Sequence, residues 1–322
     1  MELSGLLSYL VFFLSMAGIY AVLALGLNVQ WGYTGQINIG VAGFSAVGAY
    51  TAALLTTAPS ADHLGGFGVP FVVALIAAML VAGIVALAVG LITLKLRADY
   101  LAIATIGIAE IIRLFLKNEA WLTNGVRGIP SIPRPFGELG GIAESFAYLL
   151  IVLATVALVY WAVQRLFRSP WSRVLRAIRV NEDAVLAAGK NVLRFRVEAF
   201  VIGSMFMGLG GALYAHFTGF ISPGAFDPMF ATFVVWVMLI AGGSGNNRGA
   251  LLGAVVIWAI WTGTPTLIET LNGLGLVPQV LVDRASALRI FLIGLLLEVI
   301  LVTRPQGMLP ERPPRPIDTA GR

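Results

Sequence analysis

The residues whose types and spacing best suggest a binding function lie in one basic segment. Between Arg165 and Arg196 the chain carries eight of its 21 Lys and Arg residues, against two acidic residues, Glu182 and Asp183. An apolar stripe at helical spacing runs through the first part of this segment, and arginines lie on the other faces of that helix. The stripe consists of Trp171, Val174, Leu175 and Ile178, and the arginines are Arg173, Arg176 and Arg179. A short helix displayed in this way could dock to a partner.

Capping residues predict that the basic segment folds into two short helices. Pro170 favours the start of the first helix, and Asn181 is suited to cap the second. Glu182 and Asp183 would lie in the first turn, where the helix dipole favours anions, and Gly189 would end the helix. The alternative is a basic loop that only sets membrane orientation, for which uncapped arginines would suffice. The capping of so short an element favours docking.

Polar side chains inside apolar runs form a second group of candidates. Glu110 and Arg113 are one helical turn apart and can neutralise each other, which lowers the cost of placing either in a membrane. We expect this pair mainly to hold neighbouring helices together. Four amides gather at a break in the apolar pattern, namely Asn28, Gln30, Gln36 and Asn38. They could hydrogen-bond a zwitterionic solute or satisfy broken backbone, and the stretch 31–40 could be a cytoplasmic turn or a re-entrant break.

The sequence lacks the usual signatures of enzymes and metal sites. No glycine-rich phosphate loop is followed by Lys and Ser or Thr, so the chain is not expected to bind ATP itself. Two His residues without any Cys argue against a zinc site. The run 242–246 resembles a phosphate loop only superficially, and we interpret it as a tight turn. We therefore expect no enzyme activity, no metal site and no cofactor in this chain.

The composition indicates which elements must position these residues. Of 322 residues, 58% are hydrophobic and only 11% are charged, which is too few charges to cover a water-exposed surface. The net charge of +5 could suggest nucleic acid, but the basic residues lie in short loops between apolar runs. We therefore expect an all-α, polytopic membrane protein that contacts lipid and binds no nucleic acid.

Nine apolar runs are candidate transmembrane helices, because about 20 apolar residues span a bilayer core. Six are regular, at 6–27, 69–94, 147–167, 200–217, 250–268 and 288–303. Three are less regular, at 36–57, 100–116 and 230–241. We expect about 8 to 10 helices, some broken or re-entrant, in a transmembrane domain over residues 1–303. The first run is longer than the core of a signal peptide and no Lys or Arg precedes it, so we expect a retained span.

Small residues recur four positions apart in several of these runs. The pairs are Ser45 and Ala49, Gly48 and Ala52, Gly208 and Ala212, Gly211 and Ala215, and Gly249 and Gly253. This spacing allows two helix backbones to approach closely. Together with the breaks, it is more typical of discontinuous, moving helices than of a rigid anchor.

Basic residues predict the orientation, because cytoplasmic loops are enriched in Lys and Arg. This rule places the loop 168–196 and the C-terminal tail 304–322 in the cytoplasm. The segments 59–68, 117–144 and 271–285 are closer to charge balance and are expected on the other side. The tail is rich in proline, cannot continue a helix and is expected to be flexible.

Seven stretches spread along the chain carry further motifs. They lie at 24–51, which contains NVQWGYTGQINIG, and at 96–113, 123–129, 173–184, 208–216, 220–226 and 304–308. In content and in order, over nearly the whole chain, they resemble the LivM-type permeases of branched-chain amino acid ABC transporters. Asn38 and Val41 stand where members of that family often carry Ser and His. Related permeases move urea, short amides, other amino acids or aromatic acids, so these solutes stay open as alternatives.

The resemblance implies a non-catalytic subunit of an ATP-driven importer in a bacterial or archaeal plasma membrane. Its partners would be a LivH-type permease, two cytoplasmic ATPase subunits that bind ATP and Mg, and a periplasmic or lipid-anchored solute-binding protein. The loop 168–196 would be the coupling element that docks to the ATPase. Its expected contact residues are Arg176, Arg179, Asn181, Glu182, Asp183, Ala187 and Gly189.

The expected solute pathway runs along small residues between this chain and its permease partner. Its candidate residues are Asn28, Gln36, Asn38 and Glu110. A rival interpretation is a secondary transporter or channel that works alone, in which Glu110 would be the first candidate to carry ions.

Overall fold

The computed structural model describes residues 3–96 and 98–311, and this part of the chain is built from helices joined by turns and loops. The long helices are α1 (Leu3–Leu27), α2 (Val41–Thr56), α3 (Phe71–Thr93), α4 (Ala98–Asn118), α6 (Gly141–Arg168), α9 (Val192–Thr218), α10 (Phe233–Gly242), α11 (Asn247–Gly273) and α13 (Ala285–Thr303). The short ones are α5 (Ala120–Thr123), α7 (Pro170–Val180), α8 (Glu182–Ala187) and α12 (Gln279–Asp283). Each of the nine predicted apolar runs overlaps one long helix, which confirms the all-α fold.

Five helical stretches within the described residues are long and apolar enough to cross a membrane. They are Gly5–Gly32, Phe71–Thr93, Gly141–Arg168, Val192–Thr218 and Asn247–Gly273. Two shorter apolar helices accompany them, Val41–Thr56 and Phe230–Gly242. The chain is therefore a polytopic membrane protein that combines full-length helices with shorter ones.

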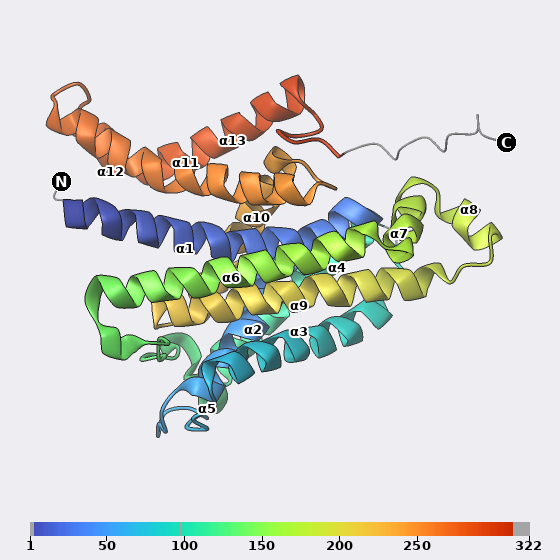
Figure 1. Ribbon diagram of the computed structural model, residues 1–322, viewed down its shortest axis with the longest axis horizontal. Coiled ribbons are helices and arrows are strands. Elements are labelled where there is room, and N and C mark those ends of the chain that lie inside the picture. Colours follow the sequence, from blue (N-terminus) through green and yellow to red (C-terminus); the bar gives the residue numbers. More distant parts are fainter. Residues whose placement is uncertain (1–2, 97, 312–322) are drawn as a thin grey trace.

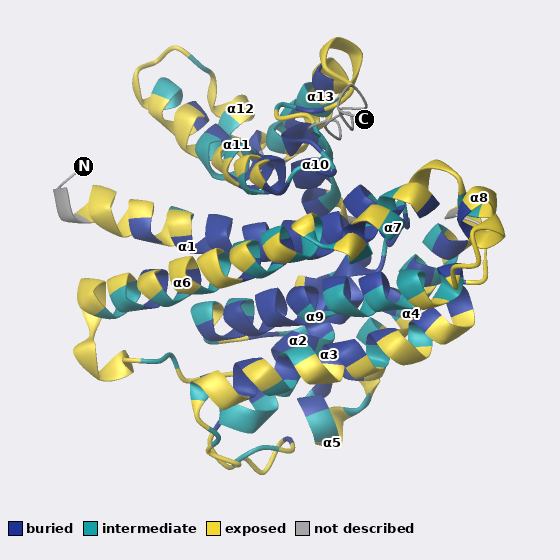
Figure 2. Ribbon diagram, turned by 45° about the vertical axis from the view of Figure 1, so that its right-hand side comes forward, coloured by how far each residue is buried: buried dark blue, intermediate teal, exposed yellow. Residues whose placement is uncertain are grey.

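Helix α9 lies at the centre of the bundle and packs against α1, α2 and α3 (Figure 1). Of its most apolar window 67% is buried, against 28% for α3. Figure 2 shows α9 largely buried while α3 and α6 expose one side. The exposed side chains of α3 are themselves apolar, among them Ile84 and Ile92. A continuous apolar outer surface of this kind is stable in lipid rather than in water. Helices α10, α11 and α13 form a second group that packs on α1.

The break after the first helix turns the chain back into the bundle. The π-helix η1 (Asn28–Gly32) continues α1, and residues 35–40 are then non-helical. The Ile39 amide donates to Thr105 Oγ1 in α4 at 2.9 Å, and the Trp236 indole donates to the Asn38 carbonyl at 2.9 Å. Side chains thus satisfy backbone groups that the break leaves inside the bundle, as a re-entrant segment requires.

The small-residue pattern marks where helices touch. Gly48 of α2 faces Gly208 of α9, and Ser45 of α2 faces Gly211 of α9. A side-chain carbon added to Gly48 would overlap the Gly208 carbonyl oxygen, and one added to Gly211 would overlap the Ser45 carbonyl oxygen. Gly253 of α11 lies equally close to the α10 backbone. The predicted close approach of backbones is confirmed at both crossings.

The beginning of the C-terminal tail is packed, which corrects the expectation of a flexible end for residues 304–311. The Met308 amide donates to the Ala241 carbonyl at 2.8 Å, and the Leu309 amide donates to the Gly242 carbonyl at 2.9 Å. Asn246 Nδ2 donates to the carbonyls of Leu309 and Pro310. Proline prevents a helix here, but extended backbone can still pair with the open carbonyls at the end of α10. The part of the tail at 312–322 lies outside the described residues.

Candidate functional site

The basic segment forms a helical knob, consisting of α7, α8 and their flanking turns over residues 169–191, at one end of the bundle (Figure 1). Helix α7 begins at Pro170, as predicted. Asn181 Oδ1 accepts a hydrogen bond from the Ala184 amide at 3.0 Å, which caps α8. Gly189 follows α8 with a φ of +73°, in the left-handed region that favours glycine. The two predicted helices and their caps are confirmed.

One face of the helical knob anchors it and another is exposed. Leu175, Ile178 and Val185 are buried against the body of the protein. Five of the seven predicted contact residues are exposed, namely Arg179, Asn181, Asp183, Ala187 and Gly189. Beside them the side chains of Val180 and Leu186 are 82% and 51% exposed. An exposed patch that mixes apolar and polar groups suits docking to another protein.

Three of the predicted contact residues, Arg176, Glu182 and the exposed Arg179, connect the helical knob to the body of the protein. The guanidinium of Arg176 lies over the Phe167 ring, 4.7 Å from its centroid. The carboxylate of Glu182 pairs with Arg196 at the start of α9, at 3.3 Å. These side chains are suited to transmit a movement of the knob into α6 and α9.

Arg179 joins the helical knob to two distant segments. One of its terminal nitrogens donates to the Gly32 carbonyl in η1, and the other pairs with the Glu311 carboxylate in the tail at 2.6 Å. Sequence reasoning missed both partners, because Gly32 and Glu311 lie 147 and 132 residues away from Arg179. The only sequence signal for these two segments was that 28–40 and 304–308 lie within stretches that carry family motifs.

The four predicted amides are fully buried at the break, and two of them form one hydrogen-bonded group. Gln30 Nε2 donates to the Phe200 carbonyl at 2.7 Å and to Ser204 Oγ at 3.0 Å, both in α9. Asn38 Nδ2 donates to Gln30 Oε1 at 2.7 Å, while Asn38 Oδ1 accepts from the Gly40 amide at 2.7 Å. These bonds fasten the non-helical segment to α9.

Asn28 belongs to a second group that reaches α6 and α11. Its Nδ2 donates to Asn247 Oδ1 at 2.9 Å, and its Oδ1 accepts from the Gly245 amide at 2.8 Å. The Tyr33 hydroxyl donates to the same Asn247 oxygen at 2.6 Å, and Asn247 Nδ2 donates to Gln164 Oε1 at 2.9 Å. Asn247, Tyr33 and Gln164 were not predicted. The Gly-rich turn before Asn247 was the available signal.

Gln36 and Glu110 lie apart from these two groups. Gln36 Nε2 donates to the Arg196 carbonyl at 2.9 Å, but its buried Oε1 has no hydrogen-bond partner within the described chain. Glu110 Oε2 accepts from Arg113 Nε at 2.8 Å, on a half-exposed part of α4. No hydrogen bond between described residues links Glu110 to the amides, so the structure does not assemble the four pathway candidates into one cluster. Their contact with solute stays a prediction.

Comparison with known proteins identifies the family. The family described as branched-chain amino acid transport system / permease component matches residues 9–301. The permease protein LivM of Salmonella typhimurium is 32% identical over 94% of this chain and 70% of its own length. The probable LivM of Methanocaldococcus jannaschii is 30% identical over 92% of each chain. The LivH permease of Salmonella typhimurium is 25% identical over 76% of this chain and 80% of its own length.

No solved structure matches this chain significantly. The family match covers the apolar helices, the break at 28–40 and the helical knob alike. The chain therefore belongs to the family of branched-chain amino acid transport system permease components.

Proposed function

We propose that this chain is the LivM-like permease subunit of an ABC importer that moves branched-chain amino acids into the cell. The observation that carries the proposal is the capped helical knob, whose tip exposes Asn181, Asp183 and Ala187 while its base is tied to the break and to the tail. An element with this arrangement can bind an ATPase and transmit its conformational change to the membrane helices. Family membership supports the solute class.

The importer would contain four further components. A LivH-like permease would pair with this chain, as the likeness to both LivM and LivH supports. Two cytoplasmic ATPase subunits would bind ATP and Mg, and a periplasmic or lipid-anchored protein would deliver the solute. The transmembrane domain 1–303 would lie in a bacterial or archaeal plasma membrane, with the loop 168–196 and the tail 304–322 in the cytoplasm.

The contacts of the break at 28–40 suggest how the transporter could alternate between outward-facing and inward-facing states. ATP binding brings the two ATPases together, and the helical knob moves with them. Because Arg179 donates to the Gly32 carbonyl, this movement displaces the backbone at the end of η1, where the break begins. The bonds of Asn28 with Asn247 and of Gln30 with Phe200 would carry that movement to α11 and α9. Of the pathway candidates, Gln36 keeps a buried oxygen that is available to a solute donor.

The test is uptake into proteoliposomes that hold the complete transporter, with ATP inside and the binding protein outside. We expect ATP-dependent uptake of leucine, isoleucine or valine. Uptake of only urea, short amides or aromatic acids would move the protein to another solute class of the same family. Uptake driven by an ion gradient without ATP would contradict the proposal. In that case Glu110→Gln would abolish transport, whereas we expect this variant to retain ATP-dependent uptake.

The link through Arg179 leads to a further prediction. We expect Arg179→Ala to lower solute-stimulated ATP hydrolysis at least about tenfold, because a charged hydrogen bond to the Gly32 carbonyl is worth about 1.5–3 kcal/mol. Glu311→Gln removes only a partly exposed ion pair, worth up to about 1 kcal/mol, and should lower it less than about fivefold. ATPase assays on reconstituted transporter check both values. Equal losses in the two variants would contradict the role of the Gly32 contact.

A further inference from the structure

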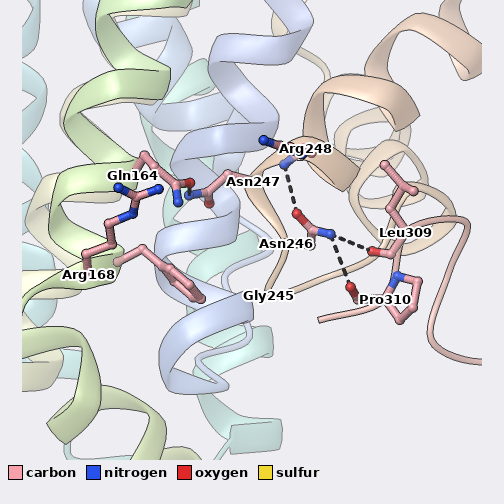
Figure 3. A pocket seen from close by; sticks show the side chains of 9 residues that line it. Gln164, Arg168, Gly245, Asn246, Asn247, Arg248, Leu309 and Pro310 are labelled. Carbon is pink, nitrogen blue, oxygen red and sulfur yellow. Dashed lines mark hydrogen bonds between the residues drawn. The ribbon is translucent and has the colours of Figure 1, made fainter. Parts of the chain in front are cut away.

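Two neighbouring cavities form one groove at the end of the bundle that carries the helical knob. A cavity of about 430 Å³ lies between the end of α6, the turn before α11 and the tail (Figure 3). A second cavity of about 460 Å³ runs along α6 toward Trp161. The two cavities share Gln164 and Arg168 in their walls, so they adjoin at the end of α6. The functional assignment above uses Asn247 in the wall of the first cavity but assigns no ligand to either cavity.

Three arginines surround this groove. Arg165 and Arg168 come from α6, and Arg248 comes from the first turn of α11 across the first cavity (Figure 3). None of them forms an ion pair with a carboxylate within residues 3–96 and 98–311, whereas Arg179 and Arg196 do. The carboxylate near the groove, that of Glu311, is held by Arg179 at 2.6 Å. No carboxylate among the described residues therefore neutralises these guanidinium groups, whose shape suits bidentate binding of a phosphate.

The walls of the groove are apolar on the side that faces the membrane. Trp161 is 63% exposed and lies on the same face of α6 as Arg165 and Arg168, one and two turns earlier. Tryptophan favours the boundary between hydrocarbon and headgroups, so both arginines lie about 6–10 Å farther out, at the level of phosphates. Phe167 and Leu309 add apolar surface at the inner end. A small anion would make no favourable contact with these apolar walls, whereas a lipid acyl chain would.

We propose that this groove binds one anionic phospholipid of the leaflet on the side of the helical knob. Arg168 and Arg248 would hold the phosphate, and an acyl chain would follow Tyr160 and Trp161 along α6. The positive-inside rule places this end in the cytoplasmic leaflet, where anionic lipids concentrate. A lipid held in this way joins α6, α11 and the tail beside Arg179, and so stabilises the base of the helical knob.

The test is lipid binding by the intact chain in neutral detergent, measured by native mass spectrometry. Phosphatidylglycerol and phosphatidylcholine with identical acyl chains are titrated in parallel. We expect one phosphatidylglycerol to be retained in preference to phosphatidylcholine, and the variant Arg168→Gln/Arg248→Gln to lose that preference at least about tenfold. The charge-conserving variant Arg168→Lys/Arg248→Lys should keep part of it, which tests the proposal even if the glutamine variant folds poorly.

The matched control removes two charges outside the groove. Arg173→Gln/Lys190→Gln changes two exposed residues of the helical knob and should leave the lipid preference unchanged. An equal loss in this control would reduce the effect to net charge and overturn the proposal. Displacement of the lipid by millimolar inorganic phosphate would assign the site to a free anion instead and would also overturn it. The assay needs neither ATPase nor solute, so its failure would leave the transport function untouched.

Discussion

Gly189→Pro is expected to abolish solute-stimulated ATP hydrolysis and uptake while the membrane subunits still assemble. Gly189 has a φ of +73°, and its amide donates to the Leu186 carbonyl at 2.9 Å. Proline fixes φ near −65° and has no amide hydrogen, so the end of α8 would open. Because α8 displays Asp183 and Ala187, the surface proposed to seat in the ATPase would be lost. Reconstituted transporter, assayed for ATP hydrolysis with and without loaded binding protein, measures the effect.

A closely matched control lies at the end of the helical bundle opposite the helical knob. Gly275 has the same φ of +73°, and its amide donates to the Asn272 carbonyl at 2.8 Å, just after α11. Neither glycine has another atom within 4 Å of the position a Cβ would take. Gly275→Pro therefore introduces the same local damage far from the helical knob and should leave coupling intact (Figure 1). Equal inhibition by Gly189→Pro and Gly275→Pro would contradict the coupling role of the helical knob.

A second variant tests charge rather than backbone. Glu182→Lys would place a cation opposite Arg196 and in the first turn of α8, where the helix dipole disfavours it. We expect coupling to fall with this variant as well, and restoration by the charge exchange Glu182→Arg/Arg196→Glu would assign the loss to the ion pair. Without restoration, Glu182 would instead be a direct contact to the ATPase.

Local sequence signals predicted the helical knob because its determinants are close together in the chain. Asn181 caps a helix that begins at the next residue, and Gly189 ends that helix, so neighbouring residues suffice to define both boundaries. The same applies to the small-residue pairs, whose four-residue spacing marks one helix face. Neighbouring residues do not determine which helix faces pack together, so the contact of Gly48 with Gly208 could be identified only in the folded structure.

The hydrogen-bond partners of the amides could not be predicted, because they come from distant segments. Asn28 and Asn247 are 219 residues apart, and Gln30 and Ser204 are 174 apart. The composition of the break showed only that polar groups had to be satisfied there. The tail illustrates the opposite error, since its prolines exclude a helix and so predict a flexible end. Backbone carbonyls at the end of α10 provided partners for it.

Gly48→Val is expected to prevent formation of the native bundle. The Cβ of any larger residue would overlap the Gly208 carbonyl oxygen, which is backbone and cannot rotate away. Helices α2 and α9 would have to separate along an extensive helix contact, and overpacking of this kind costs about 3 kcal/mol or more. Gly211→Val should act likewise, through the Ser45 carbonyl oxygen. Size-exclusion profile and melting temperature of the purified protein in detergent measure the loss.

The control for this effect is a glycine in another long helix, with free space around it. Gly107 lies in the middle of α4, and a Cβ added there has no neighbour within 4 Å. Gly107→Val should leave the melting temperature nearly unchanged, since it adds an apolar side chain on an exposed face. If Gly48→Val were as stable as Gly107→Val, the two helices could separate at little cost. The small residues would then serve movement rather than packing, because a contact that opens freely cannot hold the bundle together.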